Sequence, residues 1–227
     1  PMTVLYEDNH LMVVNKEPGE IVQGDKTGDE PLVETLKRWL KEKYGKPGNV
    51  FLGVVHRLDR PVGGVVVFAK TSKALTRLNE MFRKGEVHKT YWALTRNKPI
   101  LPAARLVNWI TTVEKTNKST AHARPVAGAK EAALSYTHRA SSDRYHLLEV
   151  NLETGRKHQI RVQLSAAGMP VKGDLKYGDK RSNPDGSISL LARRIRFEHP
   201  VSHEMIDITA PLPSDKLWQA FSDIIPN

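Results

Sequence analysis

The chain lacks cysteine, and it also lacks any long uncharged apolar run. The absence of cysteine excludes disulfide bonds, thiolate catalysis and cysteine-ligated zinc sites. No stretch is long and apolar enough to span a bilayer, and residues 1–15 show no basic segment followed by an apolar one. We therefore expect a cytoplasmic protein that makes no membrane contact.

Several common reaction motifs are also missing. The sequence contains no P-loop, no G-x-G-x-x-G after a strand, no H-E-x-x-H and no G-x-S-x-G. Its nine histidines are scattered singly, and none is paired with acidic residues at the spacing of metal ligands. We therefore expect no metal site.

Charge is the first positive feature of the composition. Lysine and arginine number 35 against 25 aspartates and glutamates, which gives a net charge of +10 and an isoelectric point near 9.7. Such a balance indicates a polyanionic partner, and the phosphate backbone of a nucleic acid is the commonest one. The alternative is a soluble protein with a basic surface and no such partner.

The pattern of apolar residues predicts a mixed fold. We expect a hairpin over 3–19, helices over 31–45 and 71–85, and a buried strand in the valine-rich stretch 54–70. Further strands are predicted over 90–95, 105–113, 132–140, 145–154, 189–197 and 205–213, with short helices over 156–168 and at the C-terminus. We find no repeat or linker, so we predict one α+β domain over residues 1–227: a mainly antiparallel sheet with flanking helices.

The stretch VVHRLDRPVGGVVVFAK, residues 54–70, places a lone carboxylate among cations between two valine runs. Asp59 lies next to Arg60 and near Arg57, so one interpretation is a structural ion pair in a turn. Connections between buried strands often carry functional groups, however, and Gly63-Gly64 would let a ligand approach the backbone. The pattern therefore also fits an ionised carboxylate acting as a nucleophile or base.

A second cluster, LETGRKHQIR at residues 152–161, crowds cations into the first turns of a predicted helix. Arg156, Lys157, His158 and Arg161 oppose the helix dipole there, which indicates that an anion is brought to the spot. A solvated basic face is the alternative. In TYWAL, neighbouring residues alternate on a strand, so one of Tyr91 and Trp92 faces the core. The segment GMPVKGDLKYG, residues 168–178, is interpreted as surface turns.

Four segments, in order and spacing, resemble the motifs of the RluA-type pseudouridine synthases. They are HRLDRPVGG (56–64), HKTYWAL (88–94), TGRKHQIRVQLSAAGMPVKGDLKYG (154–178) and LLARRIRFEHP (190–200). The resemblance extends from about Val4 to Ile208. It implies the pseudouridine synthase fold, with a central catalytic cleft. It also implies isomerisation, without a cofactor, of uridine in structured ribosomal or transfer RNA. The glycosidic bond breaks, the uracil turns, and carbon 5 bonds to the ribose.

The resemblance also implies roles for individual residues. Asp59 would be the catalytic carboxylate, either attacking the sugar or removing a ribose proton. Tyr91, with Lys89 before it, would stack on the uracil and help move the carbon 5 proton. The cation that pairs with Asp59 would be Arg161, or alternatively Arg156. Arg57 would fill the gap left by the flipped base. Further substrate contacts are expected from His56, Arg60, His158 and Gln159.

The chain departs from the family pattern at three places. Val62-Gly63-Gly64 stands where many relatives have Thr-Ser-Gly, and Leu190-Leu191-Ala192 stands where they often have Leu-His-Ala. The predicted hairpin begins near residue 4, so we expect no N-terminal RNA-binding domain. The competing functions are a catalytically silent RNA-binding or RNA-folding protein and a glycosidic hydrolase. The hydrolase needs a second carboxylate that neither motif supplies. We expect a monomer without an obligatory protein partner.

Overall fold

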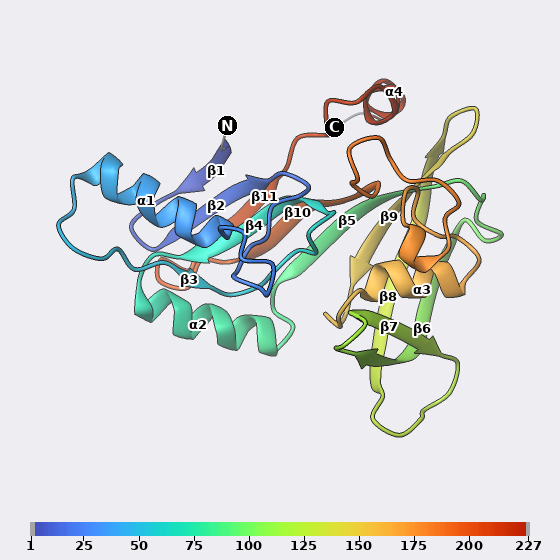
Figure 1. Cartoon of the computed structure of the whole chain (residues 1–227), viewed down its shortest axis with the longest axis horizontal. Helices are drawn as coiled ribbons and strands as arrows, with labels where there is room; N and C mark the ends of the chain where they lie inside the picture. The colour runs from blue at the N-terminus through green and yellow to red at the C-terminus, as the bar shows by residue number, and fades with distance from the viewer. Residues whose placement is uncertain (1–2, 226–227) are drawn as a thin grey trace. The chain divides into compact units, whose positions relative to one another are not determined.

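The computed structural model describes residues 3–225. Its contacts divide the chain into two compact units, Pro1–His88 with Arg194–Ala210 and Lys89–Arg193 with Pro211–Asn227 (Figure 1). Helices accompany antiparallel strand pairs in both units, which confirms the predicted α+β class. Within residues 3–225, no helix is long and apolar enough to cross a membrane.

The first unit combines antiparallel strands with two helices. Its elements are β1 (Thr3–Glu7), β2 (Leu11–Lys16), α1 (Leu32–Tyr44), β3 (Gly53–Val54), β4 (Gly63–Ala69), α2 (Ser72–Arg83), most of β10 (Leu190–Glu198) and β11 (Met205–Thr209). Strand β2 pairs with both β1 and β4, β3 pairs with β4, and β10 pairs with β11. Helix α2 packs on β3 and β4. The predicted hairpin and both predicted helices are present.

Local signals in the sequence explain where these elements begin and end. The Asp8 carboxylate accepts hydrogen bonds from the backbone N–H groups of His10 (2.7 Å) and Leu11 (2.8 Å), which closes the turn between β1 and β2. Helix α1 ends at Gly45, whose φ of 58° is accessible to glycine at little cost. The Thr71 hydroxyl caps α2 by accepting the Ala74 N–H at 3.2 Å.

One apolar core holds the first unit together. Alternate residues of β2 and β4 point into it, and α2 and the β10–β11 pair complete it. Its members include Leu11, Val13, Val65, Val67, Leu78, Phe197 and Ile206. This core gives β4, and the loop that precedes it, a rigid support.

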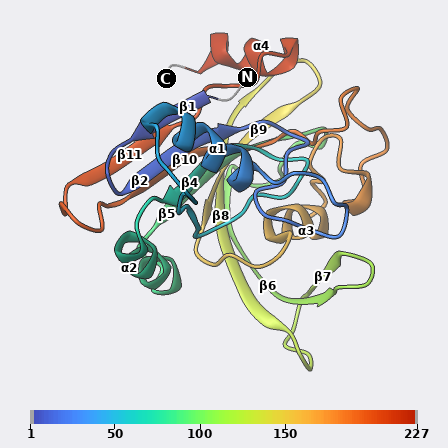
Figure 2. The same cartoon turned by 60° about the vertical axis from the view of Figure 1, so that its left-hand side comes forward.

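The second unit is a five-stranded antiparallel arrangement with its own helices. Its elements are β5 (His88–Thr95), β6 (Ala103–Val113), β7 (Lys118–His122), β8 (Lys130–Ser141), β9 (His146–Leu152), α3 (Gln159–Ala166), the 3₁₀ turn η1 (Leu175–Tyr177) and α4 (Lys216–Ile224). The strand order is β5-β9-β8-β6-β7. Figure 2 shows β6 and β8 running together as long strands, with the short β7 beside β6. Helix α3 packs on β6, β7 and η1.

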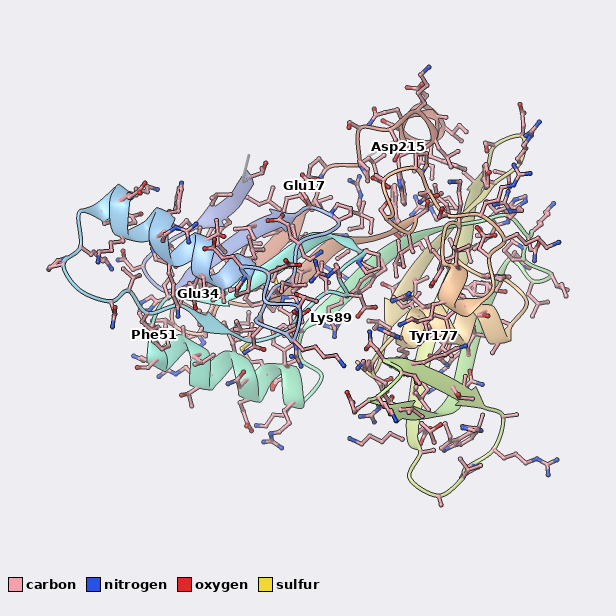
Figure 3. All side chains as sticks on the ribbon, viewed as in Figure 1. Glu17, Glu34, Phe51, Lys89, Tyr177 and Asp215 are labelled. Atoms are coloured by element: carbon pink, nitrogen blue, oxygen red, sulfur yellow. The ribbon has the colours of Figure 1, made fainter. Side chains whose placement is uncertain are left out.

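A second core lies between the strands of this unit and α4. Trp92 and Leu94 of β5 meet Leu147 of β9 and Phe221 of α4 there. Trp92 is therefore the core residue of the Tyr91-Trp92 pair, as the alternation on β5 requires. The Asp215 carboxylate, labelled in Figure 3, starts α4 by accepting the Trp218 N–H at 3.0 Å.

Two elements differ from the prediction. Strand β7 was not predicted, because KSTAH has no apolar alternation and buries only Ser119. Helix α3 begins at Gln159 rather than near 156, since His158 takes a left-handed conformation with φ 57° and interrupts the helix. Arg156 and Lys157 therefore lie in the turn before α3.

Candidate active site

The H-R-L-D segment lies where the sequence predicted, in the loop between β3 and β4 of the first unit. Asp59 is half-buried, and its carbonyl accepts the backbone N–H of Val62 at 2.9 Å. The four residues 59–62 thus form a tight turn immediately before β4. The turn holds the Asp59 backbone in one position just before the first residue of the buried strand β4.

Lys16, the last residue of β2, anchors this turn from below. It is 1% exposed, and its ammonium donates to the carbonyls of Val62 (2.6 Å), Arg60 (3.1 Å) and Glu17 (3.1 Å), with a longer contact to that of Asp59 (3.4 Å). Burial lowers the pKa of Lys16 from 10.5 to about 8. A buried cation therefore binds the carbonyls of Asp59, Arg60 and Val62 in the turn that carries the carboxylate.

The glycines after the turn serve the packing of the chain itself. A Cβ at Gly63 would lie 3.1 Å from both the Lys16 carbonyl and a ring carbon of Pro18. Gly64 has a φ of 121°, which other residues rarely adopt. At Gly63 the chain's own packing therefore already requires the absence of a side chain, a reason that the sequence did not indicate.

The other predicted residues of this loop have contacts within the first unit. The His56 imidazole accepts the Val67 N–H of β4 through Nε2 at 2.9 Å and stacks on Phe82 with ring centroids 4.9 Å apart. It thereby extends the pairing of β4 beyond the end of β3. The exposed Arg57 donates to the Gln23 side chain at 3.2 Å.

Arg60 holds the long loop that precedes α1. Its guanidinium donates to the Gly19 carbonyl at 3.1 Å and forms ion pairs with Asp29 at 3.1 Å and Asp25 at 3.4 Å. The Arg60 carbonyl in turn accepts the Gly19 N–H at 2.8 Å. The loop carrying Asp59 is thus attached to residues 17–29 from both its backbone and its side chains.

In the second unit, β5 presents the K-x-Y residues. Lys89 and Tyr91 alternate with the buried Thr90 and Trp92, so they share the half-buried face of the strand. A Cβ at Gly155 would lie 3.2 Å from the Lys89 ammonium, so this glycine leaves space for the lysine. Burial lowers the pKa of Lys89, whose position is labelled in Figure 3.

The turn before α3 is fixed by Gln159. Its side-chain oxygen accepts the Thr154 hydroxyl at 2.8 Å and the Arg156 N–H at 2.9 Å, and its amide group donates to the Ala133 carbonyl at 3.1 Å. Arg156 itself is exposed and donates to the Glu131 carbonyl at 2.9 Å. Gln159 therefore contributes to the turn rather than to an open surface.

Arg161, on the first turn of α3, is 5% exposed and binds a carboxylate. Its Nε and one terminal nitrogen donate to the two Asp174 oxygens at 2.7 and 2.9 Å. The prediction that an anion is drawn to this cluster is confirmed for Asp174. The surroundings distinguish Arg161 from the exposed Arg156, since only Arg161 lies in a buried environment suited to holding a carboxylate.

His158 is also buried, and its Nδ1 lies 2.6 Å from the Tyr177 hydroxyl. The structure therefore groups His158, Arg161, Asp174 and Tyr177 within the second unit. The interpretation of residues 168–178 as surface turns is wrong for Asp174 and Tyr177, which are 1% and 5% exposed. The sequence contains one signal that could have identified them, because Asp174 and Tyr177 lie between Gly173 and Gly178.

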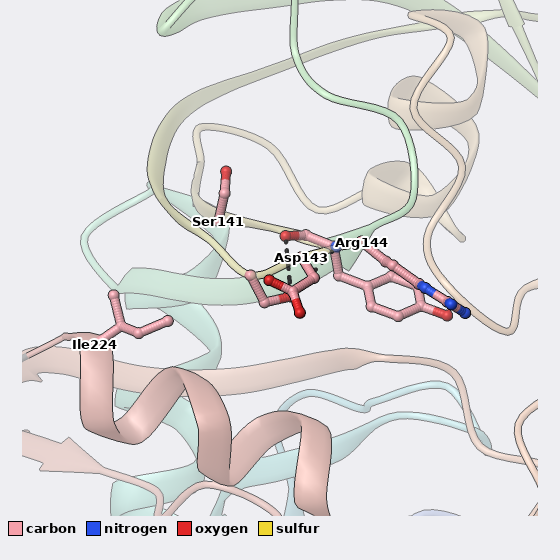
Figure 4. A pocket seen from close by; sticks show the side chains of 6 residues that line it. Ser141, Asp143, Arg144 and Ile224 are labelled. Carbon is pink, nitrogen blue, oxygen red and sulfur yellow. Dashed lines mark hydrogen bonds between the residues drawn. The ribbon is translucent and has the colours of Figure 1, made fainter.

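A shallow hollow elsewhere in the second unit contains none of the predicted residues. It measures about 540 Å³ and is lined by Ser141 to Tyr145, at the turn from β8 to β9, and by Ile224 of α4 (Figure 4). Among residues 3–225, histidine, aspartate and glutamate side chains form no group of three that could hold a metal ion. The candidate chemistry rests on Asp59, Tyr91 and Arg161.

Comparisons with known proteins identify the family to which the chain is similar. The family model for RNA pseudouridylate synthase matches residues 10–166. Ribosomal large subunit pseudouridine synthase C of Pasteurella multocida is 34% identical over 92% of the chain and 64% of its own length. Ribosomal large subunit pseudouridine synthase D of Xylella fastidiosa is 33% identical over 95% and 67%. Human RNA pseudouridylate synthase domain containing 4 superposes with a TM-score of 0.82 at 26% identity, covering 99% of this chain and 95% of that one.

Proposed function

Because the chain belongs to the RNA pseudouridylate synthase family, we propose that it isomerises uridine in structured RNA to pseudouridine, with Asp59 as the catalytic carboxylate. The chain spans about two thirds of the length of the curated relatives it matches. We assign the activity to residues 1–227 acting as one catalytic domain, because the family match includes residues of both units.

The observation that carries the proposal is the clamped turn of Asp59. Its backbone is fixed by the buried Lys16 ammonium, and the side chain stands half-buried at the start of a core strand. A carboxylate held in one place before substrate arrives avoids the cost of ordering it in the transition state.

The proposed reaction needs no cofactor, because it rearranges bonds within one nucleotide. The bond between ribose carbon 1′ and uracil N1 breaks, the uracil rotates, and carbon 5 bonds to carbon 1′. Carbon 5 then loses its proton and N1 takes one up, so that the product is an isomer of the substrate. Asp59 attacks the ribose or removes a ribose proton, and either step requires it ionised. Arg161 supplies the cation that keeps Asp59 charged, and Tyr91 stacks on the uracil and assists the proton transfer.

RNA binding is supported by an uneven distribution of charge. The second unit holds 19 lysines and arginines against 10 acidic residues, a net charge of +9, whereas the first holds 16 against 15, a net charge of +1. Phosphate contacts would therefore come mainly from the second unit. They would offset the cost of flipping the target base, a few kcal/mol. Arg57, Lys89 and Arg156 are further proposed contacts.

Ribosomal RNA is the first substrate to test, because both of the curated relatives above are named for the ribosomal large subunit. All the proposed roles are filled by residues of one chain, so we propose a monomer. Transfer RNA is the second substrate class.

The test is tritium release from RNA labelled at carbon 5 of uridine, using ribosomal and transfer RNA that lack the modification. Wild type and Asp59→Asn are compared side by side, and RNA binding is measured for both. We expect release by the wild type only, no free uracil, and similar RNA affinity for the two proteins.

Other outcomes contradict the proposal in different ways. Normal turnover by Asp59→Asn with unchanged RNA binding removes Asp59 from the chemistry. Free uracil in place of pseudouridine indicates a glycosidic hydrolase. Tight, salt-dependent RNA binding without product from either RNA class indicates a silent RNA-binding protein.

A further inference from the structure

A buried polar network in the second unit surrounds Arg161. Asp174, His158 and Tyr177 are 1%, 7% and 5% exposed, and Arg161 is 5% exposed. Asp174 directly precedes η1 and Tyr177 is its last residue. His158 directly precedes α3, and Arg161 lies in the first turn of α3. Tyr177, labelled in Figure 3, belongs to η1, which packs against α3.

Asp174 binds Arg161 in the strongest geometry available to this pair. The Nε–Oδ2 distance is 2.7 Å and the second bond, from a terminal nitrogen to Oδ1, is 2.9 Å, so the two planar groups face each other as a fork. The contact uses one edge of the guanidinium. The rotation of the arginine about its side chain is thereby fixed, and its remaining N–H donors point in a defined direction.

Tyr177 and His158 support the same guanidinium. The Tyr177 ring lies 5.0 Å from Arg161 Cζ, within range of a cation–π contact. The Tyr177 hydroxyl accepts the Ser119 N–H at 2.9 Å, and burial raises the pKa of Tyr177, so its own proton is available for His158 Nδ1 at 2.6 Å. His158 holds this contact from a left-handed backbone with φ 57°, a conformation that is costly for a residue other than glycine.

Stability alone is a poor explanation for such an arrangement. Removing two opposite charges from water costs several kcal/mol per ion, and apolar residues of similar volume often serve a core equally well. An ion pair that fixes the direction of a cation, however, has a use wherever that cation must meet a second carboxylate. The proposed function places such a demand on Arg161.

We propose that Asp174 is a positioning residue: it fixes the orientation of the Arg161 guanidinium for the role proposed above, and Tyr177 and His158 hold the same guanidinium in place. The inference rests on the proposed function, because it assigns a task to the cation in that reaction. Asp174 contacts no substrate and acts only through Arg161.

The test compares Asp174→Asn with Glu7→Gln as a matched control. Glu7 is also a buried carboxylate, 8% exposed at its side chain, but it binds Lys70 and Lys43 in the first unit. Single-turnover tritium release, RNA affinity and the midpoint of thermal unfolding are measured for each. We expect Asp174→Asn to slow release about 100-fold with unchanged RNA affinity. Glu7→Gln loses stability and keeps its rate, and Asp174→Glu recovers part of the lost rate.

A double-mutant cycle separates positioning from a general structural effect. If Asp174 acts through Arg161, adding Asp174→Asn to Arg161→Lys causes no further loss of rate. Additive losses, a wild-type rate for Asp174→Asn, or a loss of RNA affinity in place of rate would overturn the inference. Should Asp174→Asn fail to fold, Tyr177→Phe, which removes only the hydroxyl, is measured with the same readouts.

Different results contradict the proposed function and the role of Asp174. A wild-type protein that forms no pseudouridine contradicts the proposed function itself. An active wild type together with an unaffected Asp174→Asn contradicts only the role of Asp174.

Discussion

The Lys16 ammonium donates a hydrogen bond to the Val62 carbonyl at 2.6 Å, across 46 positions of the sequence. This bond joins the end of β2 to the turn that carries Asp59. Burial of a lysine is costly, and here the cost is offset by hydrogen bonds to the backbone carbonyls of Val62, Arg60 and Glu17. The contact therefore links Lys16, whose pKa is lowered, to the turn that positions Asp59, the proposed catalytic residue.

Replacing Lys16 by methionine is expected to slow pseudouridine formation at least 10-fold, because the Asp59 turn loses its anchor. Single-turnover tritium release measures the effect. Lys73→Met, on the exposed side of α2, is the control and keeps the wild-type rate. An unchanged rate for Lys16→Met would show that the turn holds its position without the ammonium.

The lowered pKa of Lys16 also predicts a pH dependence of stability. Between pH 8 and 10 the folded protein loses this proton while the unfolded chain, with a pKa near 10.5, keeps it. The free energy of unfolding therefore rises with pH in this window, by up to about 1.4 kcal/mol per pH unit. Urea unfolding at pH 8, 9 and 10 should show a steeper rise for the wild type than for Lys16→Met. Parallel curves would contradict the shift.

His56→Ala is expected to lower the free energy of unfolding by about 2 kcal/mol and to leave RNA affinity unchanged. The substitution removes the acceptor of the Val67 N–H inside the sheet, and it also removes the stacking contact with Phe82. His56→Gln, whose amide oxygen can accept the same hydrogen bond, should recover part of the stability. Lost RNA affinity with normal stability would instead support the predicted substrate contact.

The positive charge of the second unit predicts which lysines cause the salt dependence of RNA affinity. Lys115→Ala with Lys118→Ala, at the turn between β6 and β7, should lower the slope of log affinity against log salt concentration by about 1 to 2. The matched pair Lys37→Ala with Lys41→Ala, on α1 of the first unit, should leave the slope unchanged. Filter binding at several salt concentrations measures both. The opposite result would place the phosphate contacts on the first unit.

The lowered pKa of Glu7 predicts that the protein loses stability in acid. Although burial raises its pKa, hydrogen bonds from Lys70, Lys43 and Tyr44 outweigh burial and lower the pKa to about 2. The stabilisation is complete above pH 4.5 and is lost as the pH falls toward 2, because the unfolded chain takes up the proton first. Glu7→Gln should lose about 1 to 3 kcal/mol at pH 7 and flatten this part of the profile. Equal profiles in acid would refute the prediction.

Local patterns in the sequence predicted most of the fold. Helical spacing found α1 and α2, alternation found the long strands, and Pro31 and Gly45 marked the ends of α1, because each of these signals acts within a few residues. Strand β7 escaped, since its partner β6 and not its own composition makes it a strand. The predicted start of α3 near residue 156 was too early, because the left-handed conformation of His158 leaves no signal in the local pattern.

For the candidate site, the sequence by itself determined which residues we propose for the chemistry: Asp59 in a loop between buried strands, Tyr91 beside a core tryptophan, and Arg161 in a cationic cluster. Tertiary structure alone decided how the chain supports them. Lys16 binds Val62 over 46 positions, Asp174 binds Arg161 over 13, and Gly63 packs against Pro18. Such partners are chosen by which surfaces meet when the chain folds, and a local pattern of residue types does not contain that information.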